Sequence, residues 1–153
     1  SIAVRLHDLQ GNPMGYAGRR MDQTQINQYG KWKFPRDFPK NNIFFNYHRI
    51  KTHLQQALVV VECPWGVMRL SQLNIPAVAL LGTNLSNVQQ QILTGVGKVI
   101  LMLDGDNAGR SAIIKIRKML EPYNKIVQIN LAEGLDPDDL DDLSLINHLK
   151  KHF

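Results

Sequence analysis

Cysteine is scarce in this sequence, and its scarcity excludes two kinds of site. Cys63 is the single cysteine among 153 residues, so neither an internal disulfide nor a multi-cysteine zinc site can form. A reducing, cytoplasmic location fits this composition. His148 and His152 have the spacing of one helix face, but no third metal ligand stands near them in the sequence. A solvated helix face is therefore expected there.

Long apolar runs and common nucleotide-binding motifs are also missing. No run approaches the roughly 20 apolar residues of a membrane span, so no membrane partner is expected. The N-terminus lacks the charged-then-apolar pattern of a secretory signal. The sequence has no phosphate-binding loop with its lysine, no Gly-x-Gly-x-x-Gly segment and no convincing Ser/His/Asp arrangement. What remains is a soluble globular protein, with a length that fits one domain or one domain plus a small subdomain.

Positive charge is concentrated in the first third of the chain. Residues 1–57 hold nine lysines and arginines against three aspartates, a net charge of +6, whereas residues 58–153 have a net charge of −1. Such an uneven distribution indicates a polyanionic partner, and nucleic acid is favoured over a merely basic surface.

Two short segments carry much of this positive charge. Arg19 and Arg20 follow a strand-like stretch, and Lys31-Trp32-Lys33 interleaves cations with an aromatic ring. Such residues can bind phosphates and stack on bases. The alternative is a strand with an inward aromatic face, in which alternation puts Trp32 on one side and both lysines on the other.

Apolar strand patterns and helical patterns alternate four times after residue 57. The sequence predicts strands at 58–61, 77–81, 98–103 and 126–129. A helix is predicted after each strand, and the last of these helices covers 137–152. This alternation is typical of an α/β fold with about four parallel strands flanked by helices. We assign it to residues 58–153. Residues 1–57 are predicted to form a small, basic, mixed α/β subdomain, with a hairpin at 2–18, a loop at 22–30 and a short helix at 51–57.

Acidic residues follow three of the predicted strands. Glu62 ends the first strand, Asp104 and Asp106 follow the third, and Asp136 and Asp138 follow the fourth. Because parallel strands present their carboxyl ends at one edge, these acids should converge there. Carboxylate oxygens suit Mg²⁺ or Mn²⁺. Two alternatives stay open, a plain Asp-Gly turn at the third strand and helix capping at the fourth.

Several of these segments resemble the toprim domain of bacterial primases. The sequence at 104–110, Asp-Gly-Asp-Asn-Ala-Gly-Arg, is similar to that family's Asp-Gly-Asp-x-Ala-Gly-Arg segment. Residues 79–83 resemble its second strand and turn. Residues 15–19 are similar to its Gly-Phe-Gly-Gly-Arg stretch, and residues 31–35 weakly resemble its Lys-Tyr-x-Asn-x-Pro segment. The likeness covers most of the chain and is strongest in residues 58–140.

The resemblance implies the toprim fold and a primase-type nucleotidyltransferase that makes RNA primers on single-stranded DNA in replication. It implies NTPs as substrates, and a replicative helicase or a zinc-binding domain outside this chain as partners. The implied catalytic residues are Glu62, Asp104 and Asp106. The implied ligands of Mg²⁺ or Mn²⁺ are Glu62, Asp104, Asp106, Asp136 and Asp138. The expected nucleic-acid-binding residues are Arg19, Arg20, Lys31, Trp32 and Lys33.

One departure from the family pattern opens a second interpretation. The family's first motif is Glu-Gly-x-x-Asp, whereas this chain has Glu62-Cys63-Pro64-Trp65-Gly66. A glycine therefore replaces one carboxylate. The alternative function is a catalytically weakened toprim-like module that binds nucleic acid or nucleotide. A toprim nuclease is a weaker alternative, because the first third resembles a primase.

Overall fold

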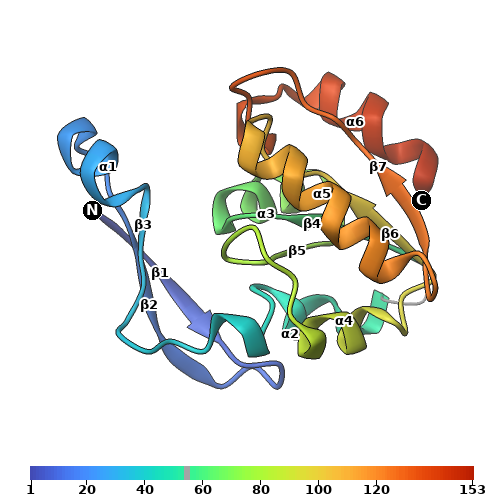
Figure 1. The fold of residues 1–153 in the computed structure, drawn as a ribbon, viewed down its shortest axis with the longest axis horizontal. Helices are drawn as coiled ribbons and strands as arrows, with labels where there is room; N and C mark the ends of the chain where they lie inside the picture. Colours follow the sequence, from blue (N-terminus) through green and yellow to red (C-terminus); the bar gives the residue numbers. More distant parts are fainter. Residues whose placement is uncertain (54–55) are drawn as a thin grey trace.

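The structure, a computed structural model, describes residues 1–53 and 56–153. Within these residues the chain forms a three-stranded sheet of order β1-β2-β3 and a four-stranded sheet of order β5-β4-β6-β7. Figure 1 shows the smaller sheet to one side of the larger, which helices flank. The predicted α/β fold with a four-stranded parallel sheet is confirmed.

The first sheet is antiparallel and ends close to the second one. Its strands are β1 (Ile2–His7), β2 (Pro13–Arg19) and β3 (Trp32–Lys33). The predicted loop at 22–30 is wrong, because the helix α1 (Gln23–Tyr29) forms there. Asp22 caps this helix by accepting a hydrogen bond from the Gln25 N–H at 2.9 Å. None of its residues is buried, so the sequence shows no apolar stripe by which to recognise it.

The second sheet carries helices on both faces. Its strands are β4 (Ala57–Val61), β5 (Ala77–Ala79), β6 (Lys98–Leu101) and β7 (Lys125–Gln128). The helices are α2 (Tyr47–Ile50), α3 (Pro64–Ser71), α4 (Asn87–Leu93), α5 (Asn107–Leu120) and α6 (Asp142–Leu149). Short 3-10 helices cover Lys40–Asn42, Lys51–His53, Pro137–Asp139 and Lys150–His152. Of the helix predicted at 51–57, residues 51–53 form a 3-10 helix, and residues 54 and 55 lie outside the described residues. Its predicted end is wrong, because Gln56 is in a turn and Ala57 starts β4.

The single last helix predicted at 137–152 is wrong. The 3-10 helix Pro137–Asp139 stops at Leu140, whose backbone is extended at φ −81° and ψ 143°. Asp141 then starts α6 as a new N-cap, accepting a hydrogen bond from the Ser144 N–H at 2.7 Å. Asp136 and Asp141 thus begin two short helices in place of the single long one.

The core lies on both faces of the four-stranded sheet. Along β4, Leu58 and Val60 pack with residues of α4 and α5, whereas Val59 and Val61 pack with residues of α3 and α6. All five residues of β4 are buried, as expected for a central parallel strand. With its flanks fixed in this way, the sheet holds the loops after its strands at one edge.

Residues 40–45 join the two sheets along the outer edge of β5. Phe45 and Ala79 form an antiparallel bridge, with N···O distances of 3.0 and 3.2 Å. The Gln89 side chain of α4 is fully buried. Its amide nitrogen donates to the Ile43 carbonyl at 2.8 Å and to the Lys40 carbonyl at 3.2 Å. A buried polar group thus anchors this connecting segment to the larger sheet.

We expect Gln89→Leu to lower the free energy of unfolding by about 2 kcal/mol. The leucine leaves the two carbonyls without their amide donor, and a buried unsatisfied polar group costs roughly 1–3 kcal/mol. Chemical denaturation followed by circular dichroism measures the change. Gln91→Leu is the matched control, because Gln91 lies on the same helix but is exposed. Equal midpoints for the two variants would contradict the anchoring role of Gln89.

Candidate active site between the two sheets

A cavity of about 320 Å³ lies where the loops after the parallel strands face the small sheet. Loops after β4, β5, β6 and β7 contribute to it, and so do the end of β2 and the start of β3. The lining residues are Arg19, Lys31, Trp32, Phe34, Glu62, Cys63, Pro64, Trp65, Leu81, Gly82, Asp104, Asp106, Asp136 and Asp138. The cavity therefore combines a cluster of carboxylates with cationic and aromatic side chains.

The structure brings together all five predicted acids with three of the predicted nucleic-acid-binding residues, Arg19, Lys31 and Trp32. Arg20 and Lys33 line a separate hollow on the small sheet. The Arg20 Nη1 donates to the carbonyls of Tyr29, Gly30 and Trp32 at 3.2, 3.0 and 2.9 Å. Strand alternation predicted Trp32 on one side and both lysines on the other. This prediction is wrong for Lys31, which lines the cavity together with Trp32. Lys31 lies before the two-residue strand β3, so the alternation of a strand does not apply to it.

Glu62 and Asp104 are partly buried neighbours in the cavity. The Asp104 backbone N–H donates to Glu62 Oε1 at 3.1 Å. Burial raises the pKa of both carboxyl groups, and the negative charge of Asp136 raises both further. Asp104 Oδ1 is buried and has no hydrogen-bond partner among the described residues. The pair thus holds negative charge where water and protein donors compensate it poorly.

The remaining acids are held by short-range contacts. Asp106 is the N-cap of α5, and its Oδ1 accepts from the Gly109 N–H at 2.7 Å. Asp136 Oδ2 accepts from Lys31 Nζ at 2.7 Å, across the cavity from the small sheet. Burial raises the pKa of Asp138. The helix-capping alternative for the fourth strand holds in part, since Asp136 begins the 3-10 helix Pro137–Asp139 and also lines the cavity. At the third strand, Asp106 caps α5 and lines the cavity as well.

Two glycines let the segment after β6 pack closely against its neighbours. A Cβ atom on Gly105 would lie 2.1 Å from the Ala132 carbonyl oxygen. A Cβ atom on Gly109 would lie 2.0 Å from the Asp104 carbonyl oxygen and 3.0 Å from Glu62 Oε1. These distances are far below van der Waals contact, so neither position has room for a side chain. The first turn of α5 can approach Asp104 and Glu62 only because Gly109 lacks one.

Gly66, which stands where the resembled motif has an aspartate, is also closely packed. It lies on α3, and an added Cβ would meet Val61 Cγ2 at 3.2 Å and Pro137 Cβ at 3.5 Å. At this position, where the resembled motif has a carboxylate, α3 instead packs against the segment that carries Asp136 and Asp138.

Sequence reasoning missed several apolar residues of the cavity. Trp65 packs edge to face against Trp32, with ring centroids 5.4 Å apart, and Phe34 lies beside them. Leu81 follows β5 with a φ of +62°, an unusual conformation for a bulky residue. No signal was available for Leu81, because the sequence placed it inside the strand predicted at 77–81, whereas β5 ends at Ala79. Trp65 offered no signal either, since its contact with Trp32 joins segments far apart in the sequence.

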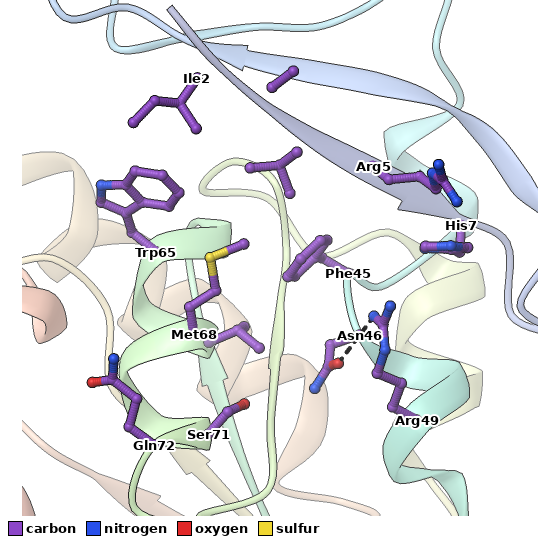
Figure 2. Close-up of a pocket in the computed structure, with 13 residues that line it drawn as sticks. Ile2, Arg5, His7, Phe45, Asn46, Arg49, Trp65, Met68, Ser71 and Gln72 are labelled. Carbon is purple, nitrogen blue, oxygen red and sulfur yellow. Dashed lines mark hydrogen bonds between the residues drawn. The ribbon is translucent and has the colours of Figure 1, made fainter.

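A second cavity of about 830 Å³ lies between β1 and α3. Figure 2 shows Trp65, Met68 and Gln72 on one side and Phe45, Asn46 and Arg49 on the other, with β1 above them. None of the predicted acids lines it. Trp65 lines both cavities, so its ring stands between them.

In the described segments we find no helix with the length and apolarity needed to cross a membrane.

Known proteins resemble this chain in sequence and in fold. A family profile described as Toprim-like matches residues 59–141, more than half of the chain. This chain belongs to the Toprim-like family. The match spans the turns after all four strands of the larger sheet, with Glu62, Asp104, Asp106, Asp136 and Asp138. The cavity is therefore built largely from the family's own segment.

Relatives of this Toprim-like chain are named as primases. It is 33% identical over 132 residues to the DNA primase of Mycoplasma genitalium, a match that covers 84% of this chain and 22% of the relative. The structure titled E. coli primase catalytic core matches with a TM-score of 0.71 at 28% identity, covering 99% of this chain and 49% of that one. A structure of the DnaG primase catalytic domain bound to ssDNA matches with a TM-score of 0.72 at 28% identity, covering 97% and 48%. The chain thus spans less than half the length of these proteins.

The cavity of this Toprim-like chain has the chemistry of a divalent-cation site but not yet the arrangement of one. Within residues 1–53 and 56–153, no three His, Cys, Asp or Glu side chains are placed so that they could already hold a metal ion. The donors are carboxylate oxygens, which hard cations prefer, and the buried Asp104 Oδ1 lacks a partner. The residues fit a divalent cation, provided that the carboxylates shift toward it.

Proposed function

We propose that this chain belongs to the catalytic core of a primase, a nucleotidyltransferase that makes RNA primers on single-stranded DNA from NTPs. The observation that carries the proposal is the cavity between the two sheets, where five carboxylates face Arg19 and Lys31. The primase names of its relatives support it. We further propose that residues 1–57 form a basic unit and residues 58–153 the toprim unit, since each contains its own sheet.

The proposed cation ligands are the carboxylates that line the cavity. These are Glu62, Asp104, Asp106, Asp136 and Asp138. Bound Mg²⁺ or Mn²⁺ would neutralise the triphosphate and offset the charge that develops during in-line attack by a 3′-hydroxyl. The all-oxygen donor set favours Mg²⁺ or Mn²⁺ over Zn²⁺, because Zn²⁺ sites usually include nitrogen or sulfur ligands.

The chain's own side chains would bind the substrate and accept a proton. Arg19 and Lys31 offer cationic groups for phosphates, and the Trp32 ring offers a face for a base. As the new bond from the 3′-oxygen to the α-phosphorus forms, the bond to pyrophosphate breaks and the hydroxyl proton must leave. Where Glu62 acts as a base instead of holding the cation, it is the proposed acceptor, because burial raises its pKa toward that of a general base. Arg20 and Lys33, outside the cavity, would contact the template farther along.

The second candidate function is a module that binds nucleic acid or nucleotide without polymerising. Gly66 supports it, since this position lacks the carboxylate of the resembled motif and is filled by packing against Val61. Both functions use the same cavity and the same cations. They differ only in whether the bound triphosphate reacts.

Partners outside this chain are part of the proposal. A matched structure is titled as the Aquifex aeolicus primase with zinc-binding and RNA polymerase domains, with a TM-score of 0.71 at 28% identity over 97% of this chain. We propose a zinc-binding domain of this kind as a partner for template selection. A replicative helicase stays a prediction of the sequence resemblance.

A primer-synthesis assay separates the candidate functions. We expect labelled NTPs, a single-stranded DNA template and Mg²⁺ or Mn²⁺ to give short RNA products with the longest natural chain that contains this sequence. Chelation with EDTA should abolish the product, because the carboxylates cannot bind the triphosphate unaided. Template and cation binding without product would favour the binding module. Cleavage of the template would instead favour the nuclease, which the sequence made the weakest alternative.

A further inference from the structure

One ion pair connects the small sheet to the acids of the cavity. Lys31 Nζ lies 2.7 Å from Asp136 Oδ2, and 105 positions separate the two residues in sequence. The lysine side chain is 52% exposed and the aspartate side chain 19% exposed. Of the salt bridges found among the described residues, this is the one that includes a cavity acid. It therefore links the residue before β3 directly to one of the proposed cation ligands.

The pair lies in a strongly negative environment. Asp136 adds to the negative charge felt by Glu62 and Asp104, and the positive charge of Lys31 acts on Asp104 in the opposite direction. Without a metal, the ammonium is thus the nearest compensation for several carboxylates. In this structure, where Lys31 is paired with Asp136, no three acidic side chains of the described residues are placed to bind a metal ion.

We propose that Lys31 is a resident counterion of the acidic cavity, and that a divalent cation displaces it from Asp136. This inference rests on the proposed function for the presence of the cation. Cation binding would then replace the ammonium of Lys31 beside Asp136 with an ion of higher charge. It would also break the ion pair that links β3 to the loop after β7.

Electrostatics favours this exchange. A divalent cation carries twice the charge of an ammonium group, and carboxylate oxygens are its preferred ligands. An ammonium only a few ångströms from the bound cation would be repelled, more strongly in a partly buried site than in bulk water. Half-exposed ion pairs are weak, so little opposes the departure of Lys31 into solvent. Asp136 is then free to shift toward Glu62 and Asp104.

Removing the lysine should tighten cation binding. We expect Lys31→Met to lower the Kd for Mn²⁺ by about threefold or more, measured by calorimetry and by electron paramagnetic resonance of free Mn²⁺. Lys33→Met is the matched control, because it removes the same charge two positions away from a side chain that lies outside the cavity. Its Kd should stay within about twofold of the original value, since exposed charges are screened by salt. Equal Kd values for the two variants, or weaker binding by Lys31→Met, would overturn the proposal.

A second measurement needs no substitution. An amine-reactive reagent, with mass spectrometry of the peptides, gives the labelling rate of each lysine with and without Mn²⁺. Because the ion pair with Asp136 holds the Lys31 ammonium against a carboxylate and shields it, we expect its labelling to become faster when Mn²⁺ binds. Lys33 should label at an unchanged rate. An unchanged or slower rate at Lys31 under saturating Mn²⁺ would contradict displacement.

The outcomes also separate this inference from the proposed function. Faster labelling of Lys31 with Mn²⁺, in a protein that makes no primers, would support the exchange and overturn the polymerase. Primer synthesis with no change at Lys31 would overturn the exchange alone. A lack of Mn²⁺ binding to the cavity would overturn both.

Discussion

Gly109→Ala is expected to lower the free energy of unfolding by about 3 kcal/mol or more. The added methyl would lie 2.0 Å from the Asp104 carbonyl oxygen, a backbone atom that cannot turn aside as a side chain can. Overpacking of a tight site typically costs about 1–3 kcal/mol and occasionally more. To relieve the clash, the first turn of α5 must move away from the end of β6. Primer synthesis and cation binding should then fall together, because Asp106 caps that same turn.

The measurement is thermal or chemical unfolding, with Gly95→Ala as the matched control. An added Cβ at Gly95 meets no atom within 4 Å, and Gly95 is exposed. The control should be neutral or slightly stabilising, by up to about 1 kcal/mol, because alanine reduces the freedom of the unfolded chain. If Gly109→Ala unfolds at the same midpoint as the control, the close packing of α5 on Asp104 is wrong.

Asp104→Asn is expected to abolish activity while making the cation-free protein more stable. Loss of this carboxylate should reduce primer synthesis by roughly 1,000-fold or more, since charge stabilisation by a bound metal is worth several kcal/mol. In the absence of cation the same carboxylate destabilises the folded protein. It is half-buried, its Oδ1 has no partner among the described residues, and it lies beside Glu62. An amide of the same shape removes the repulsion.

The gain in stability should depend on pH. Burial and the charge of Glu62 raise the pKa of Asp104 above its ordinary value of 3.8. The folded state thus holds this proton more tightly than the unfolded state. The contribution of Asp104 to stability is therefore fully present at pH values below 3.8, and it is lost as pH rises through the folded-state pKa of about 8. In Asp104→Asn this component of the pH dependence disappears.

Unfolding curves in EDTA between about pH 4 and 8 measure the effect. Glu121→Gln is a suitable control, because Glu121 forms an exposed pair with Arg117 on α5. It should leave primer synthesis and the pH profile nearly unchanged. Should Asp104→Asn be less stable than the original chain at neutral pH without cation, the view of Asp104 as a strained carboxylate would be mistaken.

The sequence was a good guide to the part of the site that follows from sheet geometry. Glu62 and Asp104 come directly after buried, β-branched strands, and parallel strands must present such positions at one edge. The prediction that these acids converge needed only the order of strand and helix. The glycines around Asp104 fitted the resemblance in the same way, and the structure adds the steric reason for them.

What the sequence could not provide depends on contacts between distant segments. Lys31 was placed with Lys33 by strand alternation, but β3 is only two residues long and Lys31 turns toward Asp136. Arg20 looked like a phosphate ligand, yet it donates to three backbone carbonyls. The helix α1 has no buried face that a periodic pattern could reveal. Each of these features is set by partners on other elements, which local propensity does not encode.

The packing at Gly66 also bears on whether a carboxylate can be introduced there by design. An added Cβ would lie 3.2 Å from Val61 Cγ2, which is tight, and 3.5 Å from Pro137 Cβ, which is an ordinary contact. The Val61 side chain would therefore have to move by a few tenths of an ångström to admit an aspartate. A shorter neighbour such as alanine at position 61 would remove the Cγ2 atom that makes this tight contact, so Gly66 and Val61 are best redesigned together.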